Sequence, residues 1–125
     1  SVIVGIVDAA VQTADKQLRK RPANSFQTVE WTRVQSDVWL LGQAYEGMLR
    51  AVESQTDARH EVLLGKTAIA ELAEGIMTRV CRICGGSTYS RRSPFGFWFE
   101  DVRALGFLRP PWPLAFETLA RPLWD

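Results

Sequence analysis

The sequence has few of the residues on which disulfide-rich and metal-dependent folds rely. Its 125 residues include two cysteines, Cys81 and Cys84, and one histidine, His60. This count excludes a disulfide framework, and the Cys-x-x-Cys pair supplies only half of a tetrahedral zinc site, so we expect no metal centre. The two thiols are instead expected to be small buried residues of a reduced, cytoplasmic protein.

Neither charge nor hydrophobicity is concentrated in this chain. Fifteen basic residues oppose fourteen acidic ones, which leaves a formal net charge of +1. A nearly neutral domain has no overall field that attracts nucleic acid or an anionic membrane surface. Every apolar run is shorter than the roughly 20 residues that a membrane span needs. We therefore expect no nucleic-acid partner and no membrane span.

The chain length fits one domain, residues 1–125, that is large enough to bury a core. The sequence has no initiator methionine and opens inside an apolar helical pattern. This opening predicts that the chain is a fragment of a longer polypeptide.

Apolar residues recur at helical spacing through most of the chain, without the alternation typical of strands. The pattern predicts four helices and a short amphipathic turn, over residues 2–19, 28–52, 57–84, 94–105 and 113–120. Helices with one apolar stripe each and short connections pack most simply in antiparallel order. The predicted fold is therefore all-α, an up-down-up-down four-helix bundle.

The second and third helices carry the clearest patterns. Thr28 is the expected N-cap of the second helix, and the third is expected to start at Asp57. Gly65 and Gly75 are expected to permit close contact between helices. The apolar stripe of the second helix is expected to be buried along its whole length, and its members are Val34, Val38, Leu41, Tyr45, Leu49 and Val52.

A paired-glycine turn joins the third helix to the fourth. Gly85 occupies the position where a positive φ would end a helix, and Gly86 leaves the backbone bare. Ser93 can cap the next helix, with Pro94 in its first turn. Such a turn suits close approach of the backbone to another chain or to a cofactor, and it is equally compatible with a simple helix end.

Aromatic residues gather just after this turn. Phe95, Phe97, Trp98 and Phe99 place four aromatic rings in five positions. One face of a helix cannot bury all four rings, so some are expected to contact another subunit or domain. The alternative is that the Pro-rich tail of the chain folds back over them.

The order of these features resembles the C-terminal helical bundle of acyl-CoA dehydrogenases over nearly the whole chain. The residues that carry the resemblance are Gly5, Arg21, Val34-Gln35, Gly85-Gly86, Ser93-Pro94 and Asp101. Trp31 and Thr32 replace the Phe-Gln of the family pattern. In that family the Arg reaches the FAD pyrophosphate, and the Gly-Gly turn lies along the adenosine part of FAD held by a neighbouring subunit.

The resemblance therefore implies cofactor-binding roles for Arg21, Gly85 and Gly86. It extends to Arg82, which stands where the family usually has Gln. The implied partners are further copies of the chain, as a dimer or tetramer, and an acyl-CoA or acyl-carrier thioester bound by the parent protein. Arg82 is equally compatible with a solvated cation at a helix end.

One departure from the family pattern concerns the catalytic base. The usual Glu of a Tyr-Glu-Gly-Thr segment is replaced, by register from Asp101, by Arg109, and an Arg cannot abstract a proton because it stays charged. The catalytic residue is thus unassigned, and the chain is closer to a divergent branch. Three functions remain open: an FAD-dependent dehydrogenase that oxidises a CH–CH bond beside a thioester, a flavin monooxygenase on the same fold, and a non-catalytic association domain.

Overall fold

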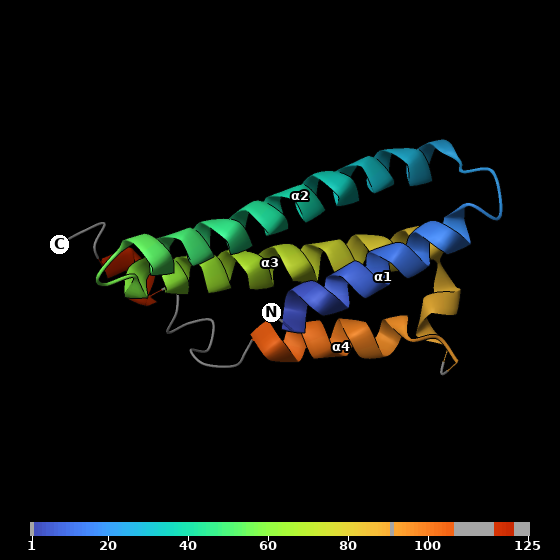
Figure 1. Cartoon of the computed structure of the whole chain (residues 1–125). Coiled ribbons are helices and arrows are strands. Elements are labelled where there is room, and N and C mark those ends of the chain that lie inside the picture. The colour runs from blue at the N-terminus through green and yellow to red at the C-terminus, as the bar shows by residue number, and fades with distance from the viewer. Residues whose placement is uncertain (1, 91, 107–116, 122–125) are drawn as a thin grey trace.

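The computed structural model describes residues 2–90, 92–106 and 117–121, and over these ranges the chain is helical and has no strand. The elements are α1 (Val2–Leu18), α2 (Ser25–Ser54), α3 (Arg59–Cys84), the 3-10 turn η1 (Gly86–Tyr89) and α4 (Phe95–Gly106). Residues 117–121 are also helical, and residues 113–116 of the expected amphipathic turn lie outside the described ranges. Successive long helices run in opposite directions (Figure 1). The predicted all-α, up-down-up-down bundle is confirmed.

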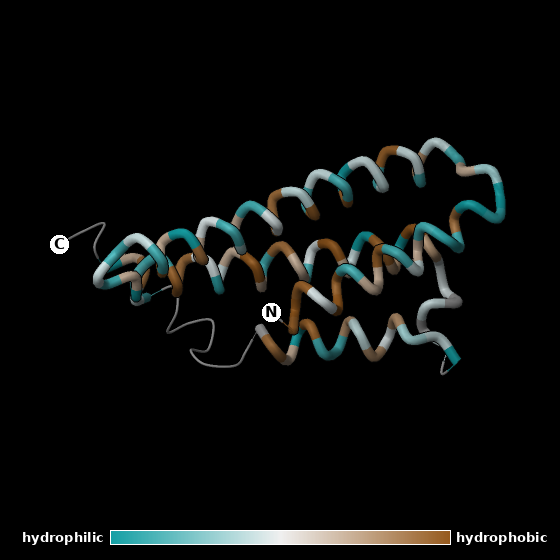
Figure 2. The backbone as a smooth tube through the Cα atoms, in the orientation of Figure 1, coloured by the Kyte–Doolittle hydropathy of each residue, from teal (hydrophilic) through white to brown (hydrophobic). Residues whose placement is uncertain are grey.

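The bundle is organised around α3, which packs against α1, α2 and α4, whereas α2 packs almost wholly against α3 (Figure 1). The buried core takes residues from all four helices: Val7, Ala10, Ala14, Val34, Leu41, Ile69, Ala73, Ile76, Met77, Val80, Cys81, Ile83, Phe95 and Val102. The connection between α1 and α2 is hydrophilic (Figure 2). This connection stands at one end of the bundle.

The start of α2 differs from the expectation that Thr28 caps it. The helix begins at Ser25, and Asn24 is the N-cap. The Gln27 amide donates to Oδ1 of Asn24 at 2.8 Å, and the Asn24 amide donates to Oε1 of Gln27 at 3.1 Å. This reciprocal capping box satisfies two helix-end donors at once. Thr28 lies inside the helix, where its hydroxyl donates to the Asn24 carbonyl.

The expected buried stripe of α2 does not hold over the last turns of the helix. Val34 and Leu41 are buried, but Leu49 and Val52 are 41% and 54% exposed. The α2–α3 hairpin extends past the first residues of α1 and the last residues of α4 (Figure 1). Val38 and Tyr45 also pack against the core, so the stripe is covered as far as Tyr45, and the last residues of α2 lie in the part of the hairpin beyond α1 and α4.

α3 begins at Arg59, two residues later than expected, and Asp57 accepts a hydrogen bond from the Arg59 amide. The Arg59 guanidinium donates two more hydrogen bonds to this carboxylate, and these, followed by the amide bond, lower the pKa of Asp57 to about 2. Gly65 faces α2 closely, because an added Cβ would lie 2.9 Å from Cβ of Met48. Gly75 has open space around it. The expectation of close packing is thus confirmed at Gly65 and wrong at Gly75.

The turn after α3 uses glycine where the backbone requires it. Gly85 has a φ of 84°, which is unfavourable for residues with a Cβ, and it is the one described residue for which a positive φ is recorded. Gly86 then opens η1. The Ser93 hydroxyl accepts a hydrogen bond from the Phe95 amide, as expected for a cap of α4.

The four aromatic rings of α4 separate into buried and exposed members. Phe95 is fully buried and meets Trp98 edge to face, with 5.5 Å between ring centroids. Trp98 and Phe99 are half-buried against the core. Phe97 is 67% exposed. Three of the four rings therefore pack in or against the core of the bundle, and Phe97 is the ring of this group that remains exposed.

Candidate functional site: a basic pocket beside the α1–α2 connection

A pocket of about 480 Å³ lies between the α1–α2 connection and the last turn of α3. Its lining comes from α1 and the residues after it, from the start of α2, and from α3: Gln17, Leu18, Lys20, Arg21, Pro22, Gln27, Ile83 and Cys84. Two of these side chains are cations, two are amides, and none is acidic. The lining thus offers hydrogen-bond donors and positive charge to a ligand.

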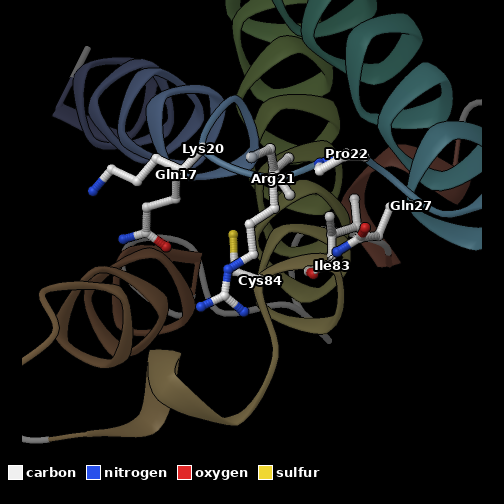
Figure 3. A pocket seen from close by; sticks show the side chains of 8 residues that line it. Gln17, Lys20, Arg21, Pro22, Gln27, Ile83 and Cys84 are labelled. Carbon is white, nitrogen blue, oxygen red and sulfur yellow. Dashed lines mark hydrogen bonds between the residues drawn. The ribbon is translucent and has the colours of Figure 1, made fainter.

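Arg21 extends from the connection toward Cys84 and the end of α3 (Figure 3). Lys20 points away from the other labelled side chains in the same view. Arg21 is exposed, and among the described residues no carboxylate pairs with it. This differs from Arg19, whose guanidinium bonds to Asp15 at 2.8 Å. The guanidinium of Arg21 is therefore available to an anionic ligand.

The structure brings Arg21 to the chain segment that leads into the glycine turn. Gly85 and Gly86 directly follow Cys84 of the lining. The Gly85 amide donates to the Cys81 carbonyl at 2.9 Å and so closes α3. No such bond is recorded for the Gly86 amide within the described part of the chain, and Gly86 is exposed. Of the two glycine amides, that of Gly86 is the one left for a ligand.

Arg82 lies apart from this arrangement. It is exposed in the last turn of α3, and it does not line the pocket. A cation at this position interacts favourably with the partial negative charge of the helix C-terminus. The structure therefore shows Arg82 as an exposed helix-end cation.

Gln27 connects two sides of the pocket. Its Nε2 donates to the Ile83 carbonyl of α3 at 3.2 Å, while its Oε1 accepts from the Asn24 amide. Ile83 is in the last turn of α3, so this bond satisfies a carbonyl that the helix itself leaves free. One side chain thereby links the N-terminus of α2 to the C-terminus of α3.

Helix ends determine the background field of the pocket. The C-termini of α1 and α3 both lie here, and each carries partial negative charge that disfavours an anion. The N-terminus of α2 has the opposite sign. Lys20 and Arg21 place positive charge beside these two C-termini and so offset their partial negative charge.

The two cysteines are free thiols, and Cys81 is buried as expected, whereas Cys84 is only half-buried because it lines the pocket. Burial raises the pKa of Cys84 to about 11, with a smaller contribution from Cys81, so the thiol is protonated at neutral pH. The pKa of Cys81 is also raised by burial, against a hydrogen bond with Thr88 that lowers it. No group of His, Cys, Asp and Glu side chains among the described residues could hold a metal ion.

Sequence reasoning identified Arg21 and the glycine turn but missed the rest of the pocket. Gln17, Lys20, Gln27 and Cys84 were not singled out as lining residues. Asn24 and Gln27 stand three apart, which is the spacing of a capping box, and that signal was present in the sequence. Arg109, the residue at the expected position of the catalytic base, lies outside the described residues.

None of the described helices is long and apolar enough to cross a membrane. No protein-family model matches the chain, and a search of curated proteins finds no match. Among solved structures, the X-ray structure of KijD3 in complex with dTDP matches with a TM-score of 0.89 and 23% sequence identity. The match covers 99% of this chain and 36% of KijD3, so the chain spans about a third of its structural neighbour. The chain therefore has the fold of that portion of KijD3.

Proposed function

We propose that this chain is the helical-bundle domain of a longer FAD-dependent oxidoreductase resembling the acyl-CoA dehydrogenases. The domain contributes Arg21 and the Gly86 amide to an FAD site that other domains and a second subunit complete. The observation that carries the proposal is the unpaired guanidinium of Arg21, which reaches from the α1–α2 connection toward the end of α3 (Figure 3). The resemblance assigns the pyrophosphate to this residue.

The donor set fits a diphosphate. A guanidinium can bond two phosphate oxygens at once, and a free backbone amide beside a glycine can approach them closely. Lys20 and Gln17 add a charge and an amide to the same lining. The pocket contains no planar aromatic ring. We therefore assign the diphosphate portion of the cofactor to this domain and the flavin ring to walls outside it.

The reaction assigned to the parent protein is oxidation of a CH–CH bond next to a thioester carbonyl. Bound FAD would accept the hydride, and a separate base would remove the α-proton. Arg109 cannot be that base, because it stays protonated. The base is expected elsewhere in the parent protein, with acyl-CoA or an acyl-carrier thioester as substrate.

A flavin monooxygenase on the same fold is the second candidate. It needs no α-proton abstraction, so an Arg at position 109 is compatible with it. The two candidates predict different products from an acyl-CoA. Anaerobic mixing with the full-length flavoprotein bleaches the flavin absorbance if the protein is a dehydrogenase, whereas a monooxygenase consumes O₂ with a reduced flavin.

A nucleoside diphosphate carries the same diphosphate group as FAD, and the dTDP of the KijD3 structure gives a specific reason to test one. The shared group is the diphosphate, which the Arg21 guanidinium would bind. FAD, dTDP and inorganic pyrophosphate should therefore be titrated separately against the same protein. Competition between FAD and dTDP would indicate one site, and additive binding would indicate two.

The test of the cofactor proposal is Arg21→Ala in the full-length protein. We expect FAD to bind about 10- to 100-fold more weakly, the worth of a hydrogen bond to a charged group, while circular dichroism stays helical. Arg19→Ala is the matched control, because Arg19 is paired with Asp15 and lines a different hollow. Equal FAD affinity in the wild type and in both variants would overturn the proposal.

A further inference from the structure

We propose that Gln27 is a positioning residue for the basic pocket, holding the Arg21 connection at a fixed distance from the end of α3. This inference rests on the proposed role of Arg21 in binding a diphosphate. It adds a second requirement. The Gln27 side chain, through its bonds to the Asn24 amide and the Ile83 carbonyl, must hold the backbone that carries Arg21 in place.

The geometry gives Gln27 two distinct bonds. Oε1 accepts from the Asn24 amide at 3.1 Å, which fixes the connection at the start of α2. Nε2 donates to the Ile83 carbonyl at 3.2 Å, which fixes the helix to the last turn of α3. Gln27 is half-buried and lines the pocket between Pro22 and Ile83. Both walls of the pocket are therefore joined through one amide group.

Arg21 itself has no such restraint. It is exposed and unpaired among the described residues, three positions before the capping residue Asn24. The backbone that carries it is anchored on the α1 side by the Arg19 and Lys20 amides, which donate to Asp15 and Gln17 carbonyls. On the α2 side the anchor is the capping box. The bond from Gln27 to the Ile83 carbonyl then connects the capping box to α3, next to Cys84 of the pocket lining.

The alternative is that Gln27 serves only to cap α2. Two variants separate the roles. Asn24→Ala removes the side-chain cap and leaves the Gln27 amide able to donate to Ile83. Gln27→Met has nearly the same length and apolar stem, and it removes both bonds. Each variant removes one of the two bonds of the capping box, and only Gln27→Met also removes the bond between α2 and α3.

The measurements are melting temperature, FAD affinity and the alkylation rate of Cys84 in the full-length protein, with dTDP titrated in parallel. Both variants should melt a few degrees lower, and Gln27→Met by more, because it loses two hydrogen bonds and Asn24→Ala loses one. FAD affinity should fall about fivefold in Gln27→Met, the value of one neutral hydrogen bond, and less than twofold in Asn24→Ala. Cys84 alkylation should accelerate in Gln27→Met alone, because the pocket wall is no longer held.

Two further variants that introduce the same charge keep the proposal testable if Gln27→Met does not fold. Gln27→Glu keeps the acceptor for the Asn24 amide but loses the donor to Ile83, whereas Gln17→Glu places the same charge in the lining without breaking a recorded bond. A greater loss of affinity in Gln27→Glu than in Gln17→Glu supports positioning. Equal losses in the two, or equal losses in Gln27→Met and Asn24→Ala, overturn it. If Arg21→Ala has no effect, the proposed function fails instead.

Discussion

Arg79 of α3 donates from Nη1 to Oε2 of Glu30 in α2 at 2.7 Å, across a separation of 49 residues in sequence. Both side chains are largely buried, with exposed fractions of 30% and 13%. Arg33 approaches the other carboxylate oxygen of Glu30 at 3.4 Å, and Asp37 lies 3.7 Å from Nε of Arg79. An ion-pair network thus joins the first part of α2 to the last turns of α3, the two longest helices.

Replacing Arg79 by Met should lower the free energy of unfolding by about 1 to 3 kcal/mol, because Glu30 is left half-buried without its closest partner. Urea denaturation measures the change. Arg50→Met is the control, since its pair with Glu46 is exposed and 3.9 Å long. In a double-mutant cycle with Glu30→Gln, we expect a coupling energy above about 0.5 kcal/mol. Strict additivity of the two substitutions would show that the pair contributes little.

Gly65 and Gly75 form a matched pair on α3. Gly65→Ala should destabilise the fold by about 1 to 3 kcal/mol, because the new methyl group would meet Cβ of Met48, an atom that cannot rotate away. Gly75→Ala should stabilise it by about 0.5 to 1 kcal/mol, since the added Cβ has open space and alanine favours the helix. Thermal melts of both variants test the packing directly. A stabilising Gly65→Ala would mean that α2 and α3 are further apart than the structure has them.

Cys84 should be a slow thiol. With a pKa of about 11, its reactive thiolate is on the order of one part in ten thousand at pH 7. The alkylation rate should rise tenfold per pH unit up to about pH 11. Because burial raises the folded-state pKa above the unfolded value, the thiol's contribution to stability is present below about pH 9 and is lost as pH approaches 11. A rate that levels off near pH 8 would contradict the burial of Cys84.

The aromatic residues of α4 should separate into packing and surface roles. Phe95→Ala should cost about 3 to 5 kcal/mol of stability, as expected for a fully buried ring. Phe97→Ser should leave the melting temperature nearly unchanged, and we expect it to reduce self-association, because Phe97 is the exposed ring of the group. Sedimentation velocity measures the association. If Phe97→Ser associates as the wild type does, the interface lies elsewhere.

Much of the fold could be predicted because helical periodicity survives in each long segment. The start of α2 was misjudged because Thr28 and Asn24 are both good caps, and the choice was made by Gln27, which completes the reciprocal bond of the capping box. The exposure of Leu49 and Val52 could not be predicted, since the stripe continues in sequence after the neighbouring helices end. Burial there depends on the lengths of other elements, which a local pattern does not contain.

The candidate site was predictable only in part. Arg21 and the glycine turn follow from the family resemblance, but the pocket needs three segments that are far apart in sequence. Ile83 contributes through its backbone carbonyl, which every residue has, so the residue type does not reveal this contact. The availability of the Gly86 amide follows in turn from Gly85, whose own amide is used to close α3. Which backbone amides are already bonded can be known only from the three-dimensional structure.

The packing of α2 almost wholly against α3 has a consequence for local unfolding of the protein. A helix whose contacts are almost all with one other helix can detach while most of the remaining contacts stay in place, so α2 should form its own cooperative unit of local unfolding. Native-state hydrogen exchange would then show its central amides exchanging at a lower free energy than those of α3. Each opening would expose Val34 and Leu41 together and break the hydrogen bond from Gln27 to Ile83, so ligand binding would be linked to the local opening of α2.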